Sequence, residues 1–179
     1  MFASIRARFQ DTKTIARLCM DAEQSARVEG RVKPGSEHFV LAALKLPDDT
    51  ARHAFRSLGI DANAFSKAIA TQFSGALAAV GVVVTRSAEA GITSPAVVAP
   101  ASALYQAESS GQALVQRIAA TRNSRGSRCL MGADVLLASA QEQHTIASRA
   151  FASLGVTKQQ LAEVAHEAIA ATQRATSEA

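Results

Sequence analysis

The clearest structural signal in the chain is the segment Pro34-Gly35-Ser36-Glu37-His38-Phe39-Val40-Leu41-Ala42-Ala43-Leu44. The Pro-Gly pair predicts a turn, and Ser36 is a residue type that caps a helix by accepting a hydrogen bond from an unpaired backbone N–H. Glu37 follows in the first turn, where the positive end of the helix dipole favours a carboxylate. The apolar residues after Glu37 therefore predict a buried helix with a polar, capped entrance.

A similar entrance occurs later, at Met131-Gly132-Ala133-Asp134-Val135-Leu136-Leu137-Ala138. A second pair of matching segments is Ala54-Phe55-Arg56-Ser57-Leu58-Gly59-Ile60 and Ala150-Phe151-Ala152-Ser153-Leu154-Gly155-Val156, which are 96 residues apart. Glu37 and Asp134 are 97 apart. Two independent segments that recur at nearly the same separation predict the duplication of one structural unit.

Composition favours helices throughout. Alanine, the best helix former, is abundant, whereas aromatic residues make up only 4% of the chain. The fold class predicted is all-α, a tandem pseudo-twofold repeat of a four-helix unit with about eight helices. We expect one domain over residues 1–179, with repeat one at about 9–73, an Ala/Val/Gly/Pro-rich linker at about 74–99 and repeat two at about 100–173.

Several boundaries follow from local signals. The first long helix is expected from Asp11 or Thr12 to about Gly30, where glycine can end a helix. Pro100 suits the first turn of a helix that ends near Thr121. In the linker, Val82-Val83-Val84 favours a short hairpin or an extended segment. The polar tail after Gln173 is expected to fray.

The chain carries few signals of catalysis or of membrane insertion. No Gly-Lys pair is present, so there is no phosphate-binding loop of the Walker type, and no G-x-S-x-G motif occurs. The histidines are scattered without an i, i+4 pair, and two isolated cysteines suit neither a metal site nor a disulfide framework: His38, His53, His144, His166, Cys19 and Cys129. We therefore expect a cytoplasmic protein that is not an enzyme, needs no cofactor or metal and does not enter a membrane.

Three segments resemble the N-terminal domain of the Clp ATPases, most closely the ClpC type: Arg8-Phe9-Gln10-Asp11, Gly35-Ser36-Glu37-His38-Phe39-Val40-Leu41 and Ala54-Phe55-Arg56-Ser57-Leu58-Gly59-Ile60. The family signature is an R-F-T-D start, a G-T-E-H-[IL]-L-L helix entrance and an A-L-x-x-L-G-[IV] helix end, each present twice. The resemblance covers residues 8–72 well. It covers residues 100–172 more weakly, because the second entrance departs from the motif at two or more positions.

The resemblance implies a non-catalytic module that binds proteins and peptides. In the family, this domain receives substrates and adaptors, and in ClpC-type members it binds phosphorylated arginine. A chain without the ATPase modules would then be an accessory factor or a decoy in Clp-dependent proteolysis. Its partners would be phosphoarginine-bearing or unfolded proteins, Clp adaptors or the ClpC–ClpP machinery. A purely structural partner of the Clp ring is a further alternative.

The ligand-binding residues implied by resemblance are those of the two helix entrances: Gly35, Ser36, Glu37, His38, Gly132 and Asp134. A carboxylate can hold a guanidinium group through two hydrogen bonds, and amides at a helix start can hold a phosphate. The alternative is that both carboxylates only stabilise helix starts, by about 0.3–1 kcal/mol each. His38 is expected to be a structural hydrogen-bonding residue.

The basic loop Arg122–Arg128 supports a different function, that of a helical nucleic-acid-binding regulator. The loop contains three arginines among small polar residues, and the chain has a net charge of +4. No aromatic residue lies among them to stack on bases, so the pattern favours a solvated loop over a nucleic-acid contact.

Overall fold

The computed structural model describes residues 2–79, 107–121, 123–125 and 128–177. Within these ranges the regular structure is helical, which confirms the all-α prediction of about eight helices. The α-helices are α1 (Phe2–Val28), α2 (Ser36–Ala43), α3 (Thr50–Ser57), α4 (Ala62–Ala79), α5 (Ser109–Ala120), α6 (Gly132–Ala140), α7 (Ile146–Ser153) and α8 (Lys158–Ser177), with a short 3-10 turn, η1 (Asn123–Arg125). The predicted valine strand at residues 82–84 lies outside the described residues.

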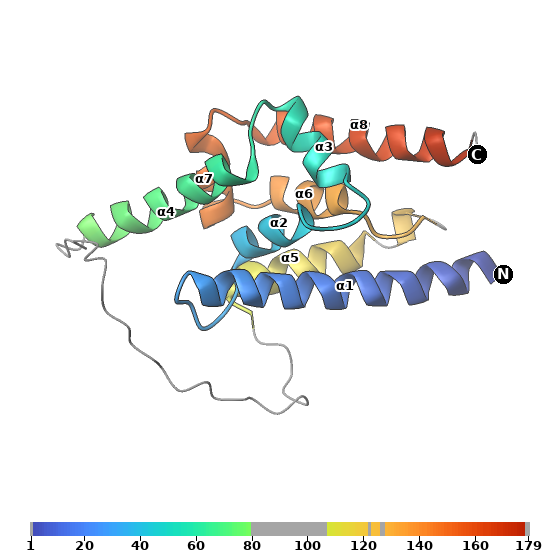
Figure 1. Cartoon of the computed structure of the whole chain (residues 1–179), viewed down its shortest axis with the longest axis horizontal. Coiled ribbons are helices and arrows are strands. Elements are labelled where there is room, and N and C mark those ends of the chain that lie inside the picture. Colours follow the sequence, from blue (N-terminus) through green and yellow to red (C-terminus); the bar gives the residue numbers. More distant parts are fainter. Residues whose placement is uncertain (1, 80–106, 122, 126–127, 178–179) are drawn as a thin grey trace.

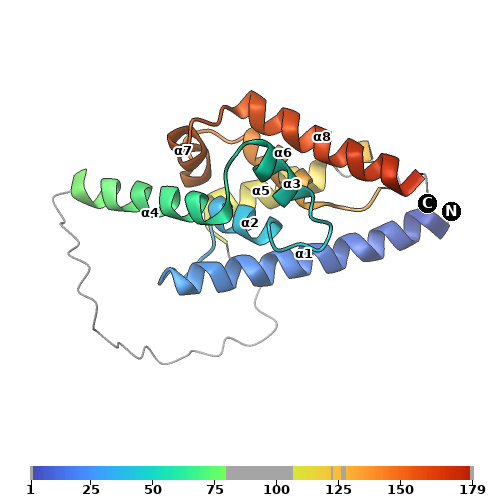
Figure 2. The ribbon, with the colours of Figure 1, turned by 45° about the horizontal axis from the view of Figure 1, so that its top comes forward.

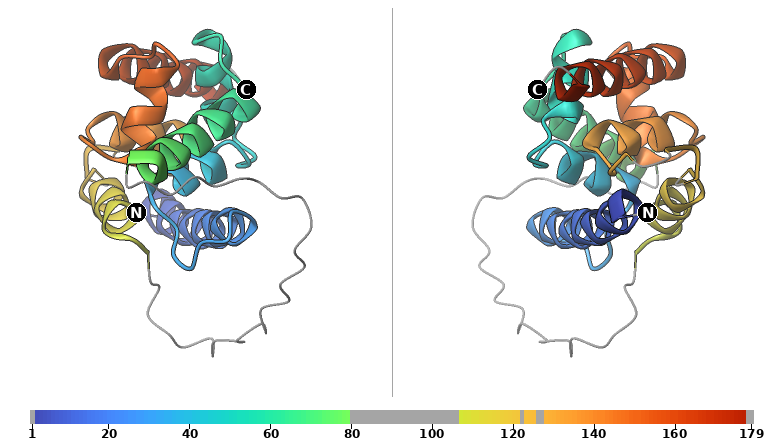
Figure 3. Two further views of the ribbon diagram at one scale, coloured as in Figure 1. Left: turned by 90° about the vertical axis from the view of Figure 1, so that its left-hand side faces the viewer. Right: turned by 90° about the vertical axis from the view of Figure 1, so that its right-hand side faces the viewer.

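The two short helices α2 and α6 form the centre of the molecule. Helix α1 packs against α2, α8 packs against α6, and α2 and α6 contact each other. Figures 1 and 2 show α1 and α8 on opposite sides of this central pair, and the end-on views of Figure 3 show the same layering. Because neighbours surround them, nearly all residues of α2 and α6 are buried, including the polar ones.

One aromatic cluster joins the two halves of the chain. The rings of Phe55 on α3, Phe65 on α4 and Phe151 on α7 lie with centroids 4.6–5.9 Å apart. Such distances are typical of favourable aromatic contacts. Since Phe151 comes from the second half, the two halves share one hydrophobic core.

The helices of the two halves follow each other at a constant separation. Helices α2, α3 and α4 begin at residues 36, 50 and 62, and α6, α7 and α8 begin 96 residues later, at 132, 146 and 158. Exposure agrees with this offset, since Leu41 and Leu137 are half-buried whereas Lys45 and Gln141 are exposed. The helix starts are thus offset by 96 residues, not by the 97 that separate Glu37 and Asp134, and the duplication itself stays a prediction.

Helices α1 and α4 are longer than predicted. Helix α1 begins at Phe2 because no Pro or Gly interrupts its first turns, and Asp11, expected as its cap, instead accepts a hydrogen bond from the Leu130 N–H at 2.7 Å. Helix α4 continues to Ala79 through Gly75, so the linker does not begin at residue 74. One glycine costs a helix only about 1 kcal/mol relative to alanine, and the helix-forming alanines and leucine around it offset that cost.

The helix predicted to start at Pro100 begins at Ser109. The residues just before it, Ala107 and Glu108, are described and are not helical. The Glu108 N–H donates to the carbonyl of Pro34 at 3.0 Å, which ties the chain to the turn before α2 and delays the helix. At the other end, α8 continues to Ser177, beyond the predicted fraying point.

Candidate functional site

The entrance of α2 is built by Gly35, Ser36 and His38. The N-cap is Gly35, so the prediction that Ser36 fills this place was wrong by one residue. The Gly35 N–H donates to Nδ1 of His38 at 2.9 Å, and Nε2 of His38 lies 3.2 Å from the carboxylate of Glu29. One ring nitrogen thus accepts a hydrogen bond and the other faces a carboxylate, which suits a histidine with a structural role.

Glu37 is fully buried at this entrance, with 0% of its surface exposed. Its Oε1 lies 3.5 Å from Nη1 of Arg31, whose Nη2 lies 2.9 Å from Glu108. Burial raises the pKa of Glu37, although the charge of Arg31 opposes the effect. The carboxylate folds back over Gly35 so closely that a Cβ there would lie 2.6 Å from Oε2, so Gly35 leaves room for Glu37.

Asp134 occupies the entrance of α6 and is also buried. It accepts the Met131 N–H at 2.9 Å, as a capping residue does, and both of its oxygens accept hydrogen bonds from the guanidinium of Arg128 at 2.7 Å. This paired arrangement raises the pKa of Arg128. A cavity of about 400 Å³ opens beside the ion pair and is also lined by Arg125 and His166.

The two predicted ligand carboxylates are not equivalent and do not lie together. Asp134 is the third residue of α6, the place that His38 takes in α2, whereas Glu37 is the second residue of its helix. A Cβ added at Gly132 would lie 3.0 Å from the carbonyl of Ala43, so the start of α6 meets the end of α2. At the other end, Glu142, which follows α6, interacts with Ser36 at the start of α2. The two helices therefore run in opposite directions and hold Glu37 and Asp134 at opposite ends of the pair.

Several backbone amides at the two helix entrances already have partners. The Gly132 N–H donates to both oxygens of Asp48 at 3.1 and 3.2 Å, and the Ala133 N–H donates to Thr50 Oγ1 at 2.9 Å. The Ser36 N–H donates to Ser110 Oγ at 3.2 Å. Each entrance is thus capped by residues from distant parts of the chain, and this satisfies donors that an isolated helix would leave free.

The described arginines of the basic loop also serve the fold. The side chain of Arg125 is only 4% exposed, lies 3.4 Å from Asp11 and donates to the carbonyl of Ile118 at 2.9 Å. Arg128 is engaged with Asp134. Two of the three cations that suggested nucleic-acid binding are therefore used inside the protein, and Arg122 lies outside the described residues.

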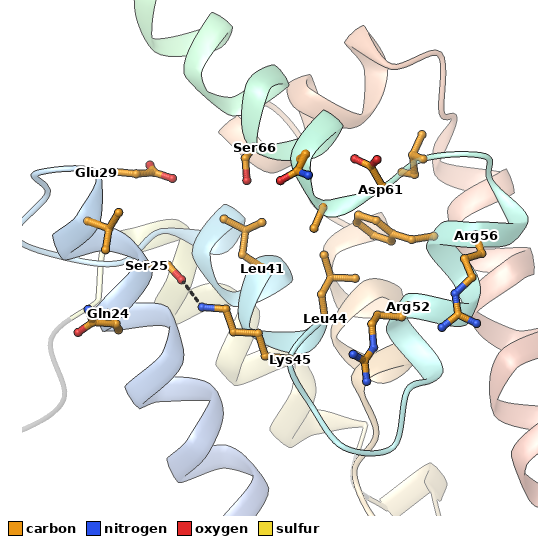
Figure 4. A pocket seen from close by; sticks show the side chains of 15 residues that line it. Gln24, Ser25, Glu29, Leu41, Leu44, Lys45, Arg52, Arg56, Asp61 and Ser66 are labelled. Carbon is orange, nitrogen blue, oxygen red and sulfur yellow. Dashed lines mark hydrogen bonds between the residues drawn. The ribbon is translucent and has the colours of Figure 1, made fainter. Parts of the chain in front are cut away.

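A larger cavity than that beside Asp134 lies elsewhere, in the first half of the chain. It is a groove of about 490 Å³ between the end of α1, helices α2 and α3 and the start of α4 (Figure 4). Buried Leu44 and Phe55 and half-buried Leu41 and Ile60 form an apolar floor. The remaining lining residues are Gln24, Ser25, Val28, Glu29, Lys45, Arg52, Arg56, Asp61, Ala62, Asn63 and Ser66.

Sequence reasoning missed this groove because its walls come from four segments that meet only after folding. One signal was present. Arg52 and Arg56 are four residues apart on an amphipathic helix, and this spacing predicts that both lie on its exposed face. Which apolar residues would border that face depends on the packing of α1 and α4.

A smaller cavity of about 310 Å³ occupies the corresponding place in the second half. Its lining includes Phe151 and Val156, which are 96 residues after Phe55 and Ile60. The positions that match Arg52 and Arg56 carry Ser148 and Ala152. The second cavity therefore keeps an apolar floor and lacks these cations.

Two general findings concern the described residues only. No group of three or more His, Cys, Asp or Glu side chains among them is arranged to hold a metal ion. None of their helices combines the length and the apolar character that crossing a membrane requires.

No protein-family model matches this chain, and no curated protein matches it.

Proposed function

We propose that this chain is a non-catalytic protein-binding module that holds a segment of a partner polypeptide in the groove between α1, α2, α3 and α4. The single observation that carries the proposal is the groove itself, a preformed cavity of about 490 Å³ with an apolar floor and a polar rim. Cavities of several hundred cubic ångströms with mostly apolar walls are typical ligand sites. The resemblance to Clp N-domains would make the partners substrates or adaptors of Clp-dependent proteolysis.

The groove suits a polypeptide side chain better than it suits a reaction. Leu44 and Phe55 close its base, and Val28, 78% exposed, extends the apolar surface at its lip. No His or Cys is among its lining residues, and the lysine that contacts a serine, Lys45, donates its hydrogen bond to Ser25 Oγ and so does not act as an acceptor for the serine proton. An apolar side chain placed on this floor would remove Val28 and Leu41 from water, which favours binding.

The first experiment tests the groove with a pair of matched variants. Val28→Ser changes an exposed residue at the lip, and Val32→Ser makes the same change at a residue that is 94% exposed and lies outside the groove. Binding of a fluorescein-labelled, permanently unfolded protein is measured by anisotropy. We expect Val28→Ser to weaken binding severalfold and Val32→Ser to leave it unchanged. If the wild type does not bind, or if both substitutions have equal effects, the groove is not the binding site.

A second candidate function, the binding of phosphoarginine, is favoured by the two internal ion pairs. Glu37 and Asp134 each face the guanidinium of an arginine that lies six residues earlier, Arg31 and Arg128. These carboxylates are thus suited to a guanidinium group. A ligand arginine would have to displace the internal one, and Arg31, at 3.5 Å, is held less closely than Arg128.

Isothermal titration with phosphoarginine and with an arginine-phosphorylated protein tests this candidate. We expect weak binding by the wild type, tighter binding by Arg31→Ala because the internal competitor is gone, and loss of binding by Glu37→Ala. Glu37→Gln, which keeps the shape of the buried side chain, guards against a general folding defect. If the wild type and Arg31→Ala both fail to bind, or if Glu37→Ala binds as the wild type does, phosphoarginine is not the ligand.

A further inference from the structure

The groove of the first half has a rim that is strongly divided in charge. In Figure 4, Lys45, Arg52 and Arg56 lie along the lower and right-hand edge, and Glu29 and Asp61 lie along the upper edge. The cations come from the residue pair after α2 and from the exposed face of α3, so they project beside the apolar floor and not into the core. Arg52 and Arg56 are both more than half exposed.

This basic edge carries more positive than negative charge. Arg52 and Arg56 share one carboxylate, Asp49, which pairs with both and has its pKa lowered chiefly by the Arg56 hydrogen bond. Lys45 donates to Ser25 Oγ at 3.3 Å, and no carboxylate pairs with it among the described residues. Three cations thus face one carboxylate, at the border of a surface made of Leu41, Leu44 and Phe55.

The two carboxylates of the groove keep their charge but lie on the opposite edge, where each is directed to another group. Glu29 faces Nε2 of the buried His38 at 3.2 Å, and Asp61 accepts the Ala64 N–H at 2.7 Å as the cap of α4. Lys45, which has no carboxylate partner among the described residues, and the two arginines, which share Asp49, therefore form a separate basic edge that an incoming carboxylate can engage.

The second half shows that the fold does not need these cations. At the offset of 96 residues, Lys45, Arg52 and Arg56 correspond to Gln141, Ser148 and Ala152, whereas Phe55 corresponds to Phe151. The apolar floor is common to both cavities, whereas Lys158 is the one cation among the described residues that line the second, against three in the first. A feature that the fold does not require, placed beside an open apolar floor, indicates selection among ligands.

We propose that the groove binds an acidic, amphipathic segment of a partner protein, with one apolar side chain on the floor and neighbouring Asp or Glu side chains paired with Lys45, Arg52 and Arg56. This inference rests on the proposed function, since it names the chemistry of the segment that the groove would hold. Charge complementarity of this kind sets partner choice and association rate more than total affinity.

The test is a selection from a randomised peptide library displayed on phage, run in parallel on three full-length chains. One is the wild type. The second carries the residues of the other half, Lys45→Gln, Arg52→Ser and Arg56→Ala. The third is a control of equal net charge that changes exposed arginines away from the groove, Arg8→Gln, Arg17→Ser and Arg149→Ala. The best wild-type peptide is then synthesised with a fluorescent label, together with a version in which Asp and Glu are replaced by Asn and Gln.

We expect the wild type and the control to select peptides with Asp or Glu beside an apolar residue, and the groove variant to select apolar peptides without that acidic preference. In anisotropy titrations the groove variant should bind the acidic peptide on the order of tenfold more weakly than the wild type, with the difference shrinking at high salt. The neutral peptide should bind the wild type and the groove variant alike.

The outcomes separate this inference from the function on which it rests. If the wild type selects apolar peptides without acidic residues, and their binding still depends on Val28, the groove remains the binding site and the acidic preference is wrong. Equal losses in the groove variant and the control would also overturn it, because net charge would then explain binding. Failure to select any peptide whose binding depends on Val28 would overturn both. An oligonucleotide that displaces the peptide with higher affinity through Lys45, Arg52 and Arg56 would assign the edge to nucleic acid.

Discussion

Arg128 and Asp134 form a closed ion pair at a buried helix start. Both guanidinium nitrogens that face Asp134 lie 2.7 Å from its oxygens, and the Met131 N–H completes its coordination. The pair of Arg31 and Glu37 is looser. Glu37 is more deeply buried than Asp134, but Nη1 of Arg31 lies 3.5 Å from its carboxylate. Removing one partner of a buried pair is costly because the other charge is left without compensation.

We therefore expect Arg128→Ala to lower the free energy of unfolding by about 2 kcal/mol. The measurement is urea-induced unfolding followed by circular dichroism. Arg17→Ala is the control, because Arg17 pairs with Asp21 on the exposed face of α1 at 3.6 Å and such pairs contribute about 0.5 kcal/mol or less. Equal effects of the two substitutions would show that the pair at Asp134 is no stronger than a surface pair.

At the scale of elements, each central helix relies on residues outside it for its cap. Helix α6 has no side-chain cap of its own at Met131, and the loop before α3 supplies Asp48 and Thr50 in its place. Asp48 also accepts hydrogen bonds from the backbone N–H and the hydroxyl of Thr50. One carboxylate therefore organises two helix starts, those of α3 and α6, across the two halves.

Asp48→Ala should consequently destabilise the protein more than loss of an ordinary cap, by about 2 kcal/mol, at the upper end of the range for caps. Asp61→Ala provides the comparison, because Asp61 caps only its own helix α4 and should cost about 1 kcal/mol. Urea unfolding gives both values, and amide hydrogen exchange of Gly132 should accelerate in Asp48→Ala alone. Unchanged protection of Gly132 would contradict the cap across halves.

Element boundaries were predictable where a local signal marks them. Gly59 and Gly155 end α3 and α7 with φ of 68° and 75°, a conformation that glycine adopts at little cost, and both were expected as helix ends. The starts of α1 and α5 were not predictable. Asp11 resembles a cap in sequence but bonds to Leu130, and Glu108 is held out of the helix by Pro34, so distant partners decided both.

In the whole molecule, two buried glutamates lie near each other where the start of α2 meets the end of α6. Burial raises the pKa of both Glu37 and Glu142, and the charge of Glu37 further raises the pKa of Glu142, as that of Glu108 raises the pKa of Glu37. Arg31 and Arg117 oppose this effect on Glu37 and Glu142 respectively, as do the hydroxyls of Ser36 and Thr145 on Glu142. The contact between the halves thus includes carboxyls that bind protons more tightly when the protein is folded.

Stability should therefore depend on pH at this contact. A carboxyl whose pKa is raised by folding contributes stability that is complete below its unfolded pKa and is lost as the pH rises through its folded pKa. We expect the urea midpoint of the wild type, relative to that of Glu37→Gln/Glu142→Gln, to fall as the pH is raised from 4.5 towards neutrality. Parallel midpoint curves for the two proteins across this range would show that the carboxyls do not titrate with folding.

The amino-acid sequence alone determined the helical class, the two similar helix entrances and the ends of α3 and α7, because helix propensity, apolar periodicity and glycine act over a few residues. The tertiary structure decided what those entrances do. It buried Glu37, paired Asp134 with Arg128, and placed the two carboxylates at opposite ends of the α2–α6 pair. It also assembled the groove from four separate segments. These features depend on which helix faces meet, and packing between distant segments is not encoded in any local pattern.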